Sequence, residues 1–314
     1  RGIYPYRDWV VKAFNDNLPF DKFITWQLAG DLLPSPTLEQ RVATGFVRMN
    51  PTTAEGGAIP KEFQAKNNFD RTETLGTVLL GATMTCARCH THKYDPIEQV
   101  EYYKLFAFFN STSEGSMDGN RYEYAPVLRA PASGQDWEAW SVLESDRVAI
   151  LEESSKLVGS VKGLDQKAWE GLDNSARFVM IADPNGFWKG QGLQSRAIDL
   201  NKKTGELQKR FTTTLVTEDL KKPRETKILQ RGEYNLPTGD SLEPGVPAVM
   251  GSLPKLAPKN RLGLAQWLIS SDQPLVSRVL INRVWQRIFG HGLVRTPEDF
   301  GLQGEQPTHP ALLD

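Results

Sequence analysis

The residues best suited to chemistry form one short run, Cys86-Ala87-Arg88-Cys89-His90, which contains both cysteines of the chain. A Cys-x-x-Cys-His run is the pattern of covalent haem attachment. Two thiols one helical turn apart can reach the two vinyl groups of a haem, while the adjacent imidazole ligates the iron. We therefore expect Cys86 and Cys89 to form the thioethers of a haem c and His90 to be the proximal iron ligand.

Two other uses of these residues stay open. Zinc could be held by Cys86, Cys89, His90 and His92, although neighbouring Cys89 and His90 cannot easily both point at one tetrahedral ion, and no second Cys or His pair lies at finger spacing. A disulfide or redox-active dithiol is the other alternative. A low thiol pKa would then require a helix N-terminus after a strand, whereas we expect Cys86 to follow a helix.

The sixth iron ligand would be a methionine or histidine from another part of the fold, unless that position is open. The candidates are His92, Met49, Met117, His291 and His309. His92 is too close in sequence to His90 for easy binding to the opposite face of a haem, and its ordinary role is a solvent-facing or hydrogen-bonded residue in a turn. Met49 could equally fill the core at the end of an amphipathic helix.

Two further sets of residues invite weaker hypotheses. Glu55, Asp70 and Asp95 could together bind a cation, but such carboxylates more often cap helices or form ion pairs. A sugar-stacking surface could be built from Trp137, Trp140, Trp169 and Trp188, but packing in the core is the commoner role of tryptophan. The sequence contains no nucleophile elbow, phosphate loop or dinucleotide fingerprint. A hydrolase acting through carboxylates is a third alternative.

Composition and charge restrict the class of protein. The 314 residues carry a formal net charge of −1 with acids and bases interspersed, so we expect no binding to nucleic acid. No run of 18 apolar residues predicts a transmembrane helix. The chain opens on Arg1 and stops at Asp314 within a starting helix, so we expect a fragment whose targeting segment lay upstream.

The elements that would position the motif are mainly helical. Helical spacing and proline breaks predict helices over 8–14, 21–33 and about 38–49, the last capped by Thr37. A long helix over 61–85 would lead directly into Cys86. Pro96 would then occupy the first turn of a helix that reaches residue 109.

The composition changes after residue 110, where a mixed α/β middle part is expected. A solvated helix is predicted over 137–157, and short strands over 178–181, 211–217 and 226–229. Helical periodicity returns from Asn260 and ends at Gly290. The predicted fold class is mainly α with a smaller α+β middle part, a helical N-terminal domain bearing the Cys-x-x-Cys-His motif, and a helical C-terminal segment.

Further runs accompany the motif, and together they are specific. They are Tyr6-Arg7-Asp8-Trp9-Val10, Leu18-Pro19-Phe20-Asp21-Lys22-Phe23, Gln27-Leu28-Ala29-Gly30-Asp31, Glu55-Gly56-Gly57-Ala58-Ile59 and the stretch from Cys86 to Ile97. With them, residues 1–112 resemble the planctomycete cytochrome-c-like domain of unknown function.

A second set of runs lies in the C-terminal part. It includes Arg231-Gly232, Pro244-Gly245-Val246-Pro247, Asn260-Arg261-Leu262, Asn282-Arg283-Val284-Trp285 and Glu298-Asp299-Phe300-Gly301. These runs resemble the companion planctomycete-specific domain that follows on the same chain. We therefore expect three parts, over 1–112, 113–204 and a truncated 205–314, with the middle part lacking a counterpart.

The resemblance implies a large exported protein and no defined reaction. Together with the motif, it leads us to expect a periplasmic or extracellular c-type haem protein that passes single electrons to an unknown redox partner protein. It would act as a module of a larger oxidoreductase. The alternative is a non-haem extracellular binding or structural module, with a metal or disulfide at the motif.

Overall fold

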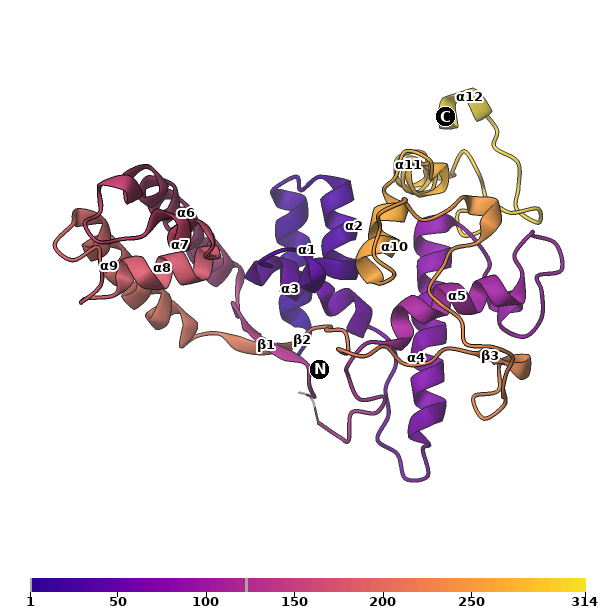
Figure 1. Ribbon diagram of the computed structural model, residues 1–314. Coiled ribbons are helices and arrows are strands. Elements are labelled where there is room, and N and C mark those ends of the chain that lie inside the picture. Colours follow the sequence, from indigo (N-terminus) through magenta and orange to yellow (C-terminus); the bar gives the residue numbers. More distant parts are fainter. Residues whose placement is uncertain (1, 122–123) are drawn as a thin grey trace.

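A computed structural model of the chain describes residues 2–121 and 124–314, and helices dominate it (Figure 1). The N-terminal helices are α1 (Tyr4–Asn15), α2 (Phe20–Ala29), α3 (Leu38–Ala43), α4 (Pro60–Leu75) and α5 (Gln99–Asn110). The middle part contains β1 (Val127–Ala130), α6 (Gly134–Leu157), α7 (Gln166–Glu170), α8 (Asn174–Ala182), α9 (Gly192–Gln208) and β2 (Thr212–Leu215). The C-terminal part contains β3 (Ile228–Leu229), β4 (Pro237–Thr238), α10 (Arg261–Leu268), α11 (Pro274–Phe289) and α12 (Pro310–Leu313).

Local sequence signals explain several helix ends. Thr37 forms the expected cap of α3, since its side chain accepts a hydrogen bond from the Gln40 backbone N–H while the Gln40 side chain accepts one from the Thr37 N–H. Gly290 ends α11 with φ at +84°, a conformation that glycine adopts without steric cost. These predictions are confirmed.

The prediction of one helix from residue 61 to Cys86 is wrong at the C-terminal end of that helix. Helix α4 stops at Leu75, a π-helical turn covers Gly76–Leu80, and Gly81 adopts a left-handed φ of +55°. A side chain at this position would collide with the rings and methyl groups of Phe300 and Val279. The left-handed glycine therefore separates the motif from α4. Pro96 also lies outside a helix, because α5 begins at Gln99 after its cap residue, Glu98.

The middle part is more helical than predicted. The strand predicted over 178–181 is part of α8, because Asp173 caps that helix and the buried Phe178, Ile181 and Ala182 follow a helical rather than an alternating pattern. The strand predicted over 211–217 is confirmed in β2, which pairs antiparallel with β1 from Val127↔Leu215 to Ala130↔Thr212. The predicted helix over 137–157 is confirmed in α6.

Helices α6 to α9 form an extension that the β1–β2 ribbon connects to the rest of the molecule (Figure 1). The extension has its own core, which includes Trp169 and Trp188 with ring centroids 5.6 Å apart. At its base, Trp137 and Trp140 pack in a second core with Trp9 of α1. All four tryptophans considered for sugar stacking are at most 8% exposed, so they pack in cores instead of forming a surface.

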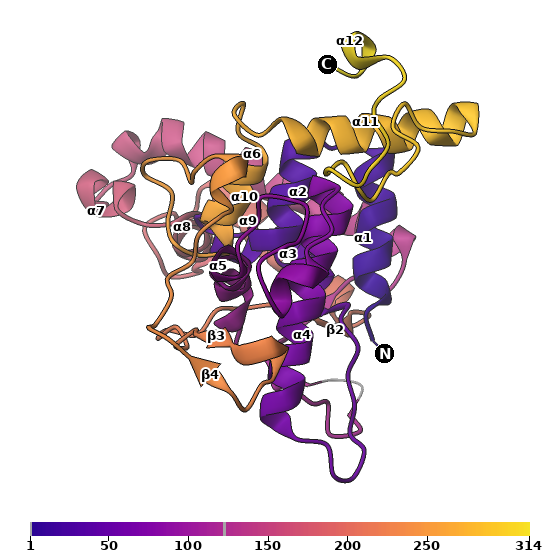
Figure 2. The ribbon, with the colours of Figure 1, turned by 90° about the vertical axis from the view of Figure 1, so that its right-hand side faces the viewer.

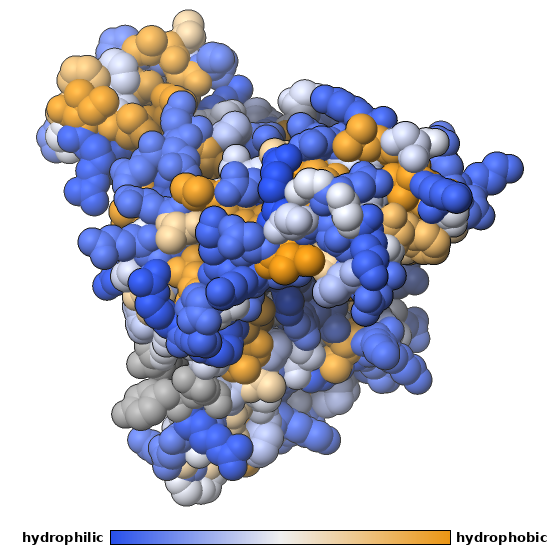
Figure 3. Space-filling model, turned by 90° about the vertical axis from the view of Figure 1, so that its left-hand side faces the viewer, coloured by the Kyte–Doolittle hydropathy of each residue, from blue (hydrophilic) through white to orange (hydrophobic). Residues whose placement is uncertain are grey.

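The outer surface of this extension is mostly polar. Figure 3 faces the molecule from that side and shows hydrophilic residues over most of the near surface, with apolar residues there in small groups and one larger apolar group at the upper left of the view. Small scattered groups are normal on a protein surface. Among residues 2–121 and 124–314, no helix combines the length and apolar character that spanning a membrane requires.

The main core joins the N-terminal and C-terminal parts. It contains Phe69 and Tyr102 from α4 and α5, and also Leu264 and Trp267 from α10. Helix α10 lies beside α2, as Figures 1 and 2 both show. Segments more than 150 residues apart in sequence therefore close the hydrophobic core that supports the motif.

A buried arginine crosses this junction. Arg261 of α10 is fully buried and donates two hydrogen bonds to the carboxylate of Asp31, at 2.9 and 2.7 Å, and one to Asp219 at 2.9 Å. It also donates to the Leu28 carbonyl at 2.6 Å. Burial alone would lower the pKa of Arg261, but the two carboxylates outweigh this effect and the pKa is raised. Arg261 is therefore a fully paired internal cation.

A second buried ion pair joins α4 to the segment after α5. Arg71 pairs with Glu114, and both side chains are 4% exposed. Arg71 also donates to the Val47 carbonyl at 2.9 Å and to Thr112 at 3.0 Å. Burial would raise the pKa of Glu114, but the charges of Arg71 and Arg48 outweigh burial and lower it.

Replacing Arg261 with methionine tests the first junction. The Arg261→Met variant leaves the buried carboxylate of Asp31 without its cation, so we expect its free energy of unfolding to fall by about 3–5 kcal/mol. Urea unfolding followed by circular dichroism measures the loss. Lys259→Met is the matched control, because Lys259 pairs with Glu243 at the exposed surface and its loss changes little. Equal unfolding midpoints of the two variants would contradict this role of Arg261.

The Arg71–Glu114 pair predicts a pH dependence of stability. Because the folded-state pKa of Glu114 lies below its unfolded value of about 4.3, the pair stabilises the fold above that pH and loses this contribution as pH falls through the lower folded-state pKa. The stability difference between wild type and Glu114→Gln should therefore shrink between neutral and strongly acidic pH. Urea unfolding at several pH values measures it. Glu62→Gln is the control, because Glu62 pairs with Lys66 at the surface. If the loss of unfolding free energy caused by Glu114→Gln stayed constant with pH, this linkage would be ruled out.

Candidate functional site

The motif lies on a short 3-10 turn, η4 (Thr85–Arg88). The backbone N–H groups of Cys89 and His90 both donate to the Cys86 carbonyl, at 3.3 and 3.4 Å. Ala87, between the cysteines, is fully buried in the main core, whereas Cys86 is exposed and Cys89 is half-buried. Both cysteines are free thiols. The turn is therefore held by its alanine while its thiols stay near the surface.

Helix α5 holds the backbone of this turn. The Arg88 carbonyl accepts hydrogen bonds from the Gln99 side chain at 3.1 Å and from the Tyr103 hydroxyl at 3.0 Å. Burial raises the pKa of Tyr103, so its hydroxyl keeps its proton and remains a donor. The hydroxyl also lies 3.1 Å from the Leu229 carbonyl, which brings the C-terminal part against the motif.

Glu73 of α4 connects the motif to the helix that precedes it. Its carboxylate accepts hydrogen bonds from Thr85 at 3.2 Å, from Arg88 at 3.4 Å and from the Tyr102 hydroxyl at 3.0 Å. Burial would lower the pKa of Arg88, but the charge of Glu73 outweighs it and the pKa is raised. Arg88 therefore stays charged, with its guanidinium 4.9 Å from the ring centre of Phe69.

The segment Gln230–Gly232 packs directly on the second cysteine. The Cys89 thiol donates to the Arg231 carbonyl at 3.3 Å. Gly232 adopts φ of +75°, and a Cβ there would lie 3.2 Å from the Arg88 Cγ and 3.4 Å from the Cys89 sulfur. A glycine is needed for this close approach. The Arg231-Gly232 run of the second resemblance is thus part of the wall of the motif.

His90 is exposed, and its ring has a defined orientation. Its Nδ1 lies 2.7 Å from the Thr91 carbonyl oxygen. Because a carbonyl only accepts, Nδ1 carries the proton in this bond, and in the neutral ring Nε2 then has the lone pair. A hydrogen bond from Nδ1 to a backbone carbonyl is the usual support of a metal-ligating histidine.

His92 has a different environment and is only 6% exposed. Its Nδ1 accepts hydrogen bonds from the backbone N–H groups of Tyr94 at 3.3 Å and Asp95 at 2.8 Å, and its Nε2 lies 3.4 Å from the Thr83 hydroxyl. Of the roles considered for it, the structure assigns it the hydrogen-bonded position in a turn. Its Nδ1 lone pair is not available to iron in this arrangement.

The other candidate sixth ligands make no hydrogen bond or ion pair with the motif in the described ranges. Met49 is 56% exposed and lines a cavity of about 190 Å³ together with Asp70 and Arg71. His291 and His309 are exposed, and Met117 is half-buried in the segment after α5. The sixth ligand therefore stays a prediction.

Within residues 2–121 and 124–314, no three His, Cys, Asp or Glu side chains lie close enough together to bind one metal ion. This result disfavours a preformed zinc site at Cys86 to His92. It also disfavours a joint cation site of Glu55, Asp70 and Asp95. Asp70 is half-buried, and burial raises the pKa of its carboxyl group.

The donor set of the motif fits covalent haem attachment. Two free thiols stand one turn apart, and the next residue presents an imidazole whose Nε2 is available. The cavity that follows the motif in the chain is lined by Ala82, Asp95 and Ile97 and does not include the two cysteines or His90. A haem held here would consequently be anchored at the surface.

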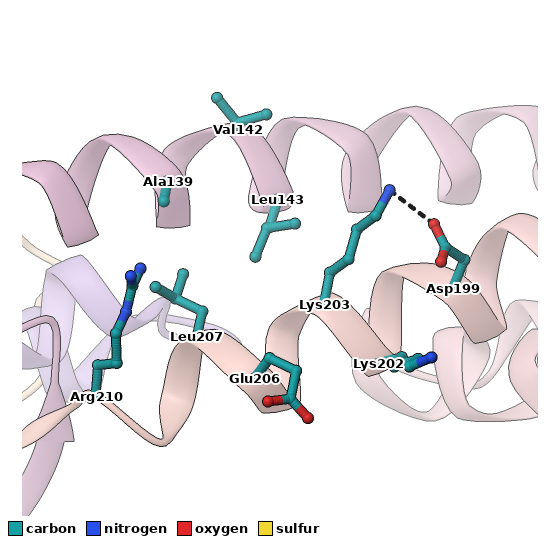
Figure 4. Close-up of a pocket in the computed structure, with 9 residues that line it drawn as sticks. All are labelled: Ala139, Val142, Leu143, Asp199, Lys202, Lys203, Glu206, Leu207 and Arg210. Atoms are coloured by element: carbon teal, nitrogen blue, oxygen red, sulfur yellow. Dashed lines mark ion pairs between the residues drawn. The ribbon is translucent and has the colours of Figure 1, made fainter.

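A larger groove lies between α6 and α9 and shows no comparable chemistry. Its volume is about 720 Å³, and Leu143 and Leu207 face each other across it (Figure 4). Two of the ion pairs at its edges join Lys203 to Asp199 at 2.7 Å and Arg210 to Asp136 at 2.7 Å. Such a groove is ordinary space between amphipathic helices.

Sequence reasoning identified the residues of the motif, whose ligand roles stay predictions, but it did not identify the residues that support the motif. The sequence pattern gives no sign of this supporting role, because it places all three supporting residues at ordinary surface or core positions of helices. They are Glu73, Gln99 and Tyr103. No sequence spacing relates Glu73 to Arg88 or Tyr103 to Leu229. The Arg231-Gly232 run carries the second family resemblance, but nothing in its sequence indicates that it contacts Cys89.

Comparison with protein families supports the resemblance in both parts. Residues 1–114 match the family described as PSCyt2, protein of unknown function (DUF1549). Residues 260–314 match the family described as PSD1, protein of unknown function (DUF1553), so this match begins later than the expected position 205. No curated protein and no solved structure matches the chain.

The unequal environments of the two thiols predict unequal reactivity. Cys86 is exposed, whereas Cys89 is half-buried and donates to the Arg231 carbonyl, so we expect iodoacetamide to modify Cys86 several-fold faster. Peptide mass spectrometry over a time course measures both rates. In urea the difference should vanish, which provides the control. Equal rates in the folded protein would contradict the contact between Cys89 and Arg231.

Proposed function

We propose that this chain is an exported c-type haem protein that passes single electrons, as a module of a larger oxidoreductase whose substrate is unknown. The observation that carries the proposal is the ring orientation of His90. Its Nδ1 is engaged with the Thr91 carbonyl at 2.7 Å, directly after a turn with two free thiols. The proposal includes a redox partner protein and a location in the periplasm or outside the cell, where haem is attached and used.

Cys86 and Cys89 would hold the cofactor covalently. Each thiol would add its S–H bond across a vinyl double bond, so that one sulfur–carbon bond forms, the proton goes to the neighbouring carbon and no oxidant is needed. Their separation of one turn is maintained because Ala87 is buried and the Arg88 carbonyl is held by Gln99 and Tyr103.

His90 would supply the proximal nitrogen. The hydrogen bond from Nδ1 to Thr91 fixes the tautomer and makes Nε2 a better donor. When bound, a haem c supplies a one-electron iron couple. The surface position of Cys86 and His90 favours rapid electron exchange with a docking partner, and water access at such a site tends to stabilise the more charged oxidised state.

A disulfide or dithiol function is the second candidate, because both cysteines are free and one is exposed. In that function Cys86 would be the attacking thiol and Cys89 the resolving one. The helix N-terminus that lowers a thiol pKa in redox-active motifs is lacking here, since the turn η4 follows Gly81 and has no long helix behind it in the described segment. The haem proposal therefore explains more of the site, including His90.

The test is a reduced-minus-oxidised visible spectrum with a pyridine haemochrome assay. The chain is produced in a periplasm that carries cytochrome c maturation proteins. We expect a c-type signal in the wild type and none in the Cys86→Ala, Cys89→Ala double variant. The His90→Ala variant should keep covalent haem but change its spin state, and added imidazole should restore the wild-type spectrum.

Glu298→Gln is the matched control, because Glu298 is exposed, lies outside the motif and is not a candidate iron ligand, so its loss should leave the spectrum unchanged. A control cytochrome produced alongside reports whether maturation worked. If that cytochrome carries haem and this chain carries none, the haem proposal fails. A disulfide between Cys86 and Cys89 in the same preparation would then favour the second candidate.

A further inference from the structure

A cavity of about 410 Å³ lies between the loop that follows the motif and the start of α11. Its walls are mostly apolar and come from five separate segments of the chain. They include Leu80, Ile97, Met250, Leu275 and Phe300. This volume is within the range of sites for small molecules, and an apolar wall with few polar groups is their usual composition.

The charged side chains of this wall are both acidic. Asp95 and Asp272 line the cavity, whereas no lysine or arginine does. Asp95 is 7% exposed, and its Oδ1 accepts a hydrogen bond from the Leu302 N–H at 2.7 Å. Gly301 allows this contact, because a Cβ there would collide with the carboxylate.

Asp95 has no cationic partner among the described residues. The one nearby basic group is His92, whose Nδ1 lies 3.6 Å from the Asp95 Oδ2. Since the same Nδ1 accepts backbone N–H groups from Tyr94 and Asp95, it does not donate to the Asp95 carboxylate. Burying a carboxylate without a lysine or arginine partner is costly, and a cationic ligand in the cavity would stabilise it.

Gln273 contributes a second buried polar group that lacks a partner. It is 4% exposed, and its Oε1 accepts the Leu275 N–H at 3.1 Å as the cap of α11. This bond fixes which end of the amide is oxygen, and the Nε2 at the other end is a buried donor without a hydrogen-bond partner among the described residues. The cavity wall therefore contains a buried carboxylate without a cation and a buried amide donor without an acceptor.

We propose that this cavity binds a small organic cation, an amine with an apolar body that also carries an oxygen acceptor. The ammonium group pairs with Asp95, the apolar body contacts Ile97, Leu275 and Phe300, and the acceptor receives the Gln273 amide. An inorganic cation fits less well, because calcium needs six to eight oxygen ligands and magnesium an octahedral shell, and most of this wall is apolar. An anion would be repelled by the two carboxylates, and no lysine or arginine lines the cavity to offset this repulsion.

Isothermal titration calorimetry with three probes of one shape tests this assignment on the full chain. The probes are benzylammonium, the neutral benzyl alcohol and the anionic benzoate. We expect benzylammonium to bind about ten-fold tighter than benzyl alcohol, because a hydrogen bond to a charged group contributes more than a neutral one, and benzoate not to bind. This comparison needs no variant and no haem, so it is independent of the proposed function.

Asp95→Asn should abolish the preference for the cation while keeping the acceptor for the Leu302 N–H. Glu305→Gln, a carboxylate outside the cavity wall, is the matched control and should leave all three affinities unchanged. Equal affinities of the amine and the alcohol for the wild type would overturn the proposal, as would the lack of binding of all three probes at millimolar concentration. Displacement of benzylammonium by calcium chloride, but not by sodium chloride of equal ionic strength, would assign Asp95 to a metal instead.

Discussion

The buried guanidinium of Arg261 is the constraint on which the arrangement of this protein depends. It binds Asp31 through two nitrogens and Asp219 through the third, with no exposure to water. A buried charge is tolerated only when its partners are in place, so α10, the end of α2 and the segment after β2 must assemble together. The two regions that match different families consequently share one hydrophobic core.

This joint core explains why the motif can be held on so short a turn. The turn Thr85–Arg88 has little hydrogen bonding of its own, and its order comes from neighbours on every side. Tyr103 of α5 and Glu73 of α4 hold it from the N-terminal part, while Arg231 and Gly232 cover it from the C-terminal part. The geometry of the cysteines is therefore a property of both parts, and a fragment limited to residues 1–114 would lack one wall of its site.

The two candidate sites lie at opposite ends of one loop. His90 presents its Nε2 at the surface, whereas His92 turns inward and uses Nδ1 to order the backbone that carries Asp95. One short stretch of sequence thus provides an exposed imidazole at one end and a buried carboxylate beside a cavity at the other. If both proposals hold, an electron carrier and a binding site for a small cation share the same structural support.

The sequence by itself determined which atoms are available for chemistry. It also determined most helices of the N-terminal and C-terminal parts, because caps, prolines and periodicity act over a few residues, as at Thr37 and Gly290. Tertiary structure decided where those atoms lie. Val279 and Phe300 pack where a side chain on Gly81 would lie, at the end of the helical run before the motif. Residues 178–181 are helical because one face packs in the core of the extension. Such outcomes depend on packing between segments far apart in the chain, and no local pattern encodes that packing.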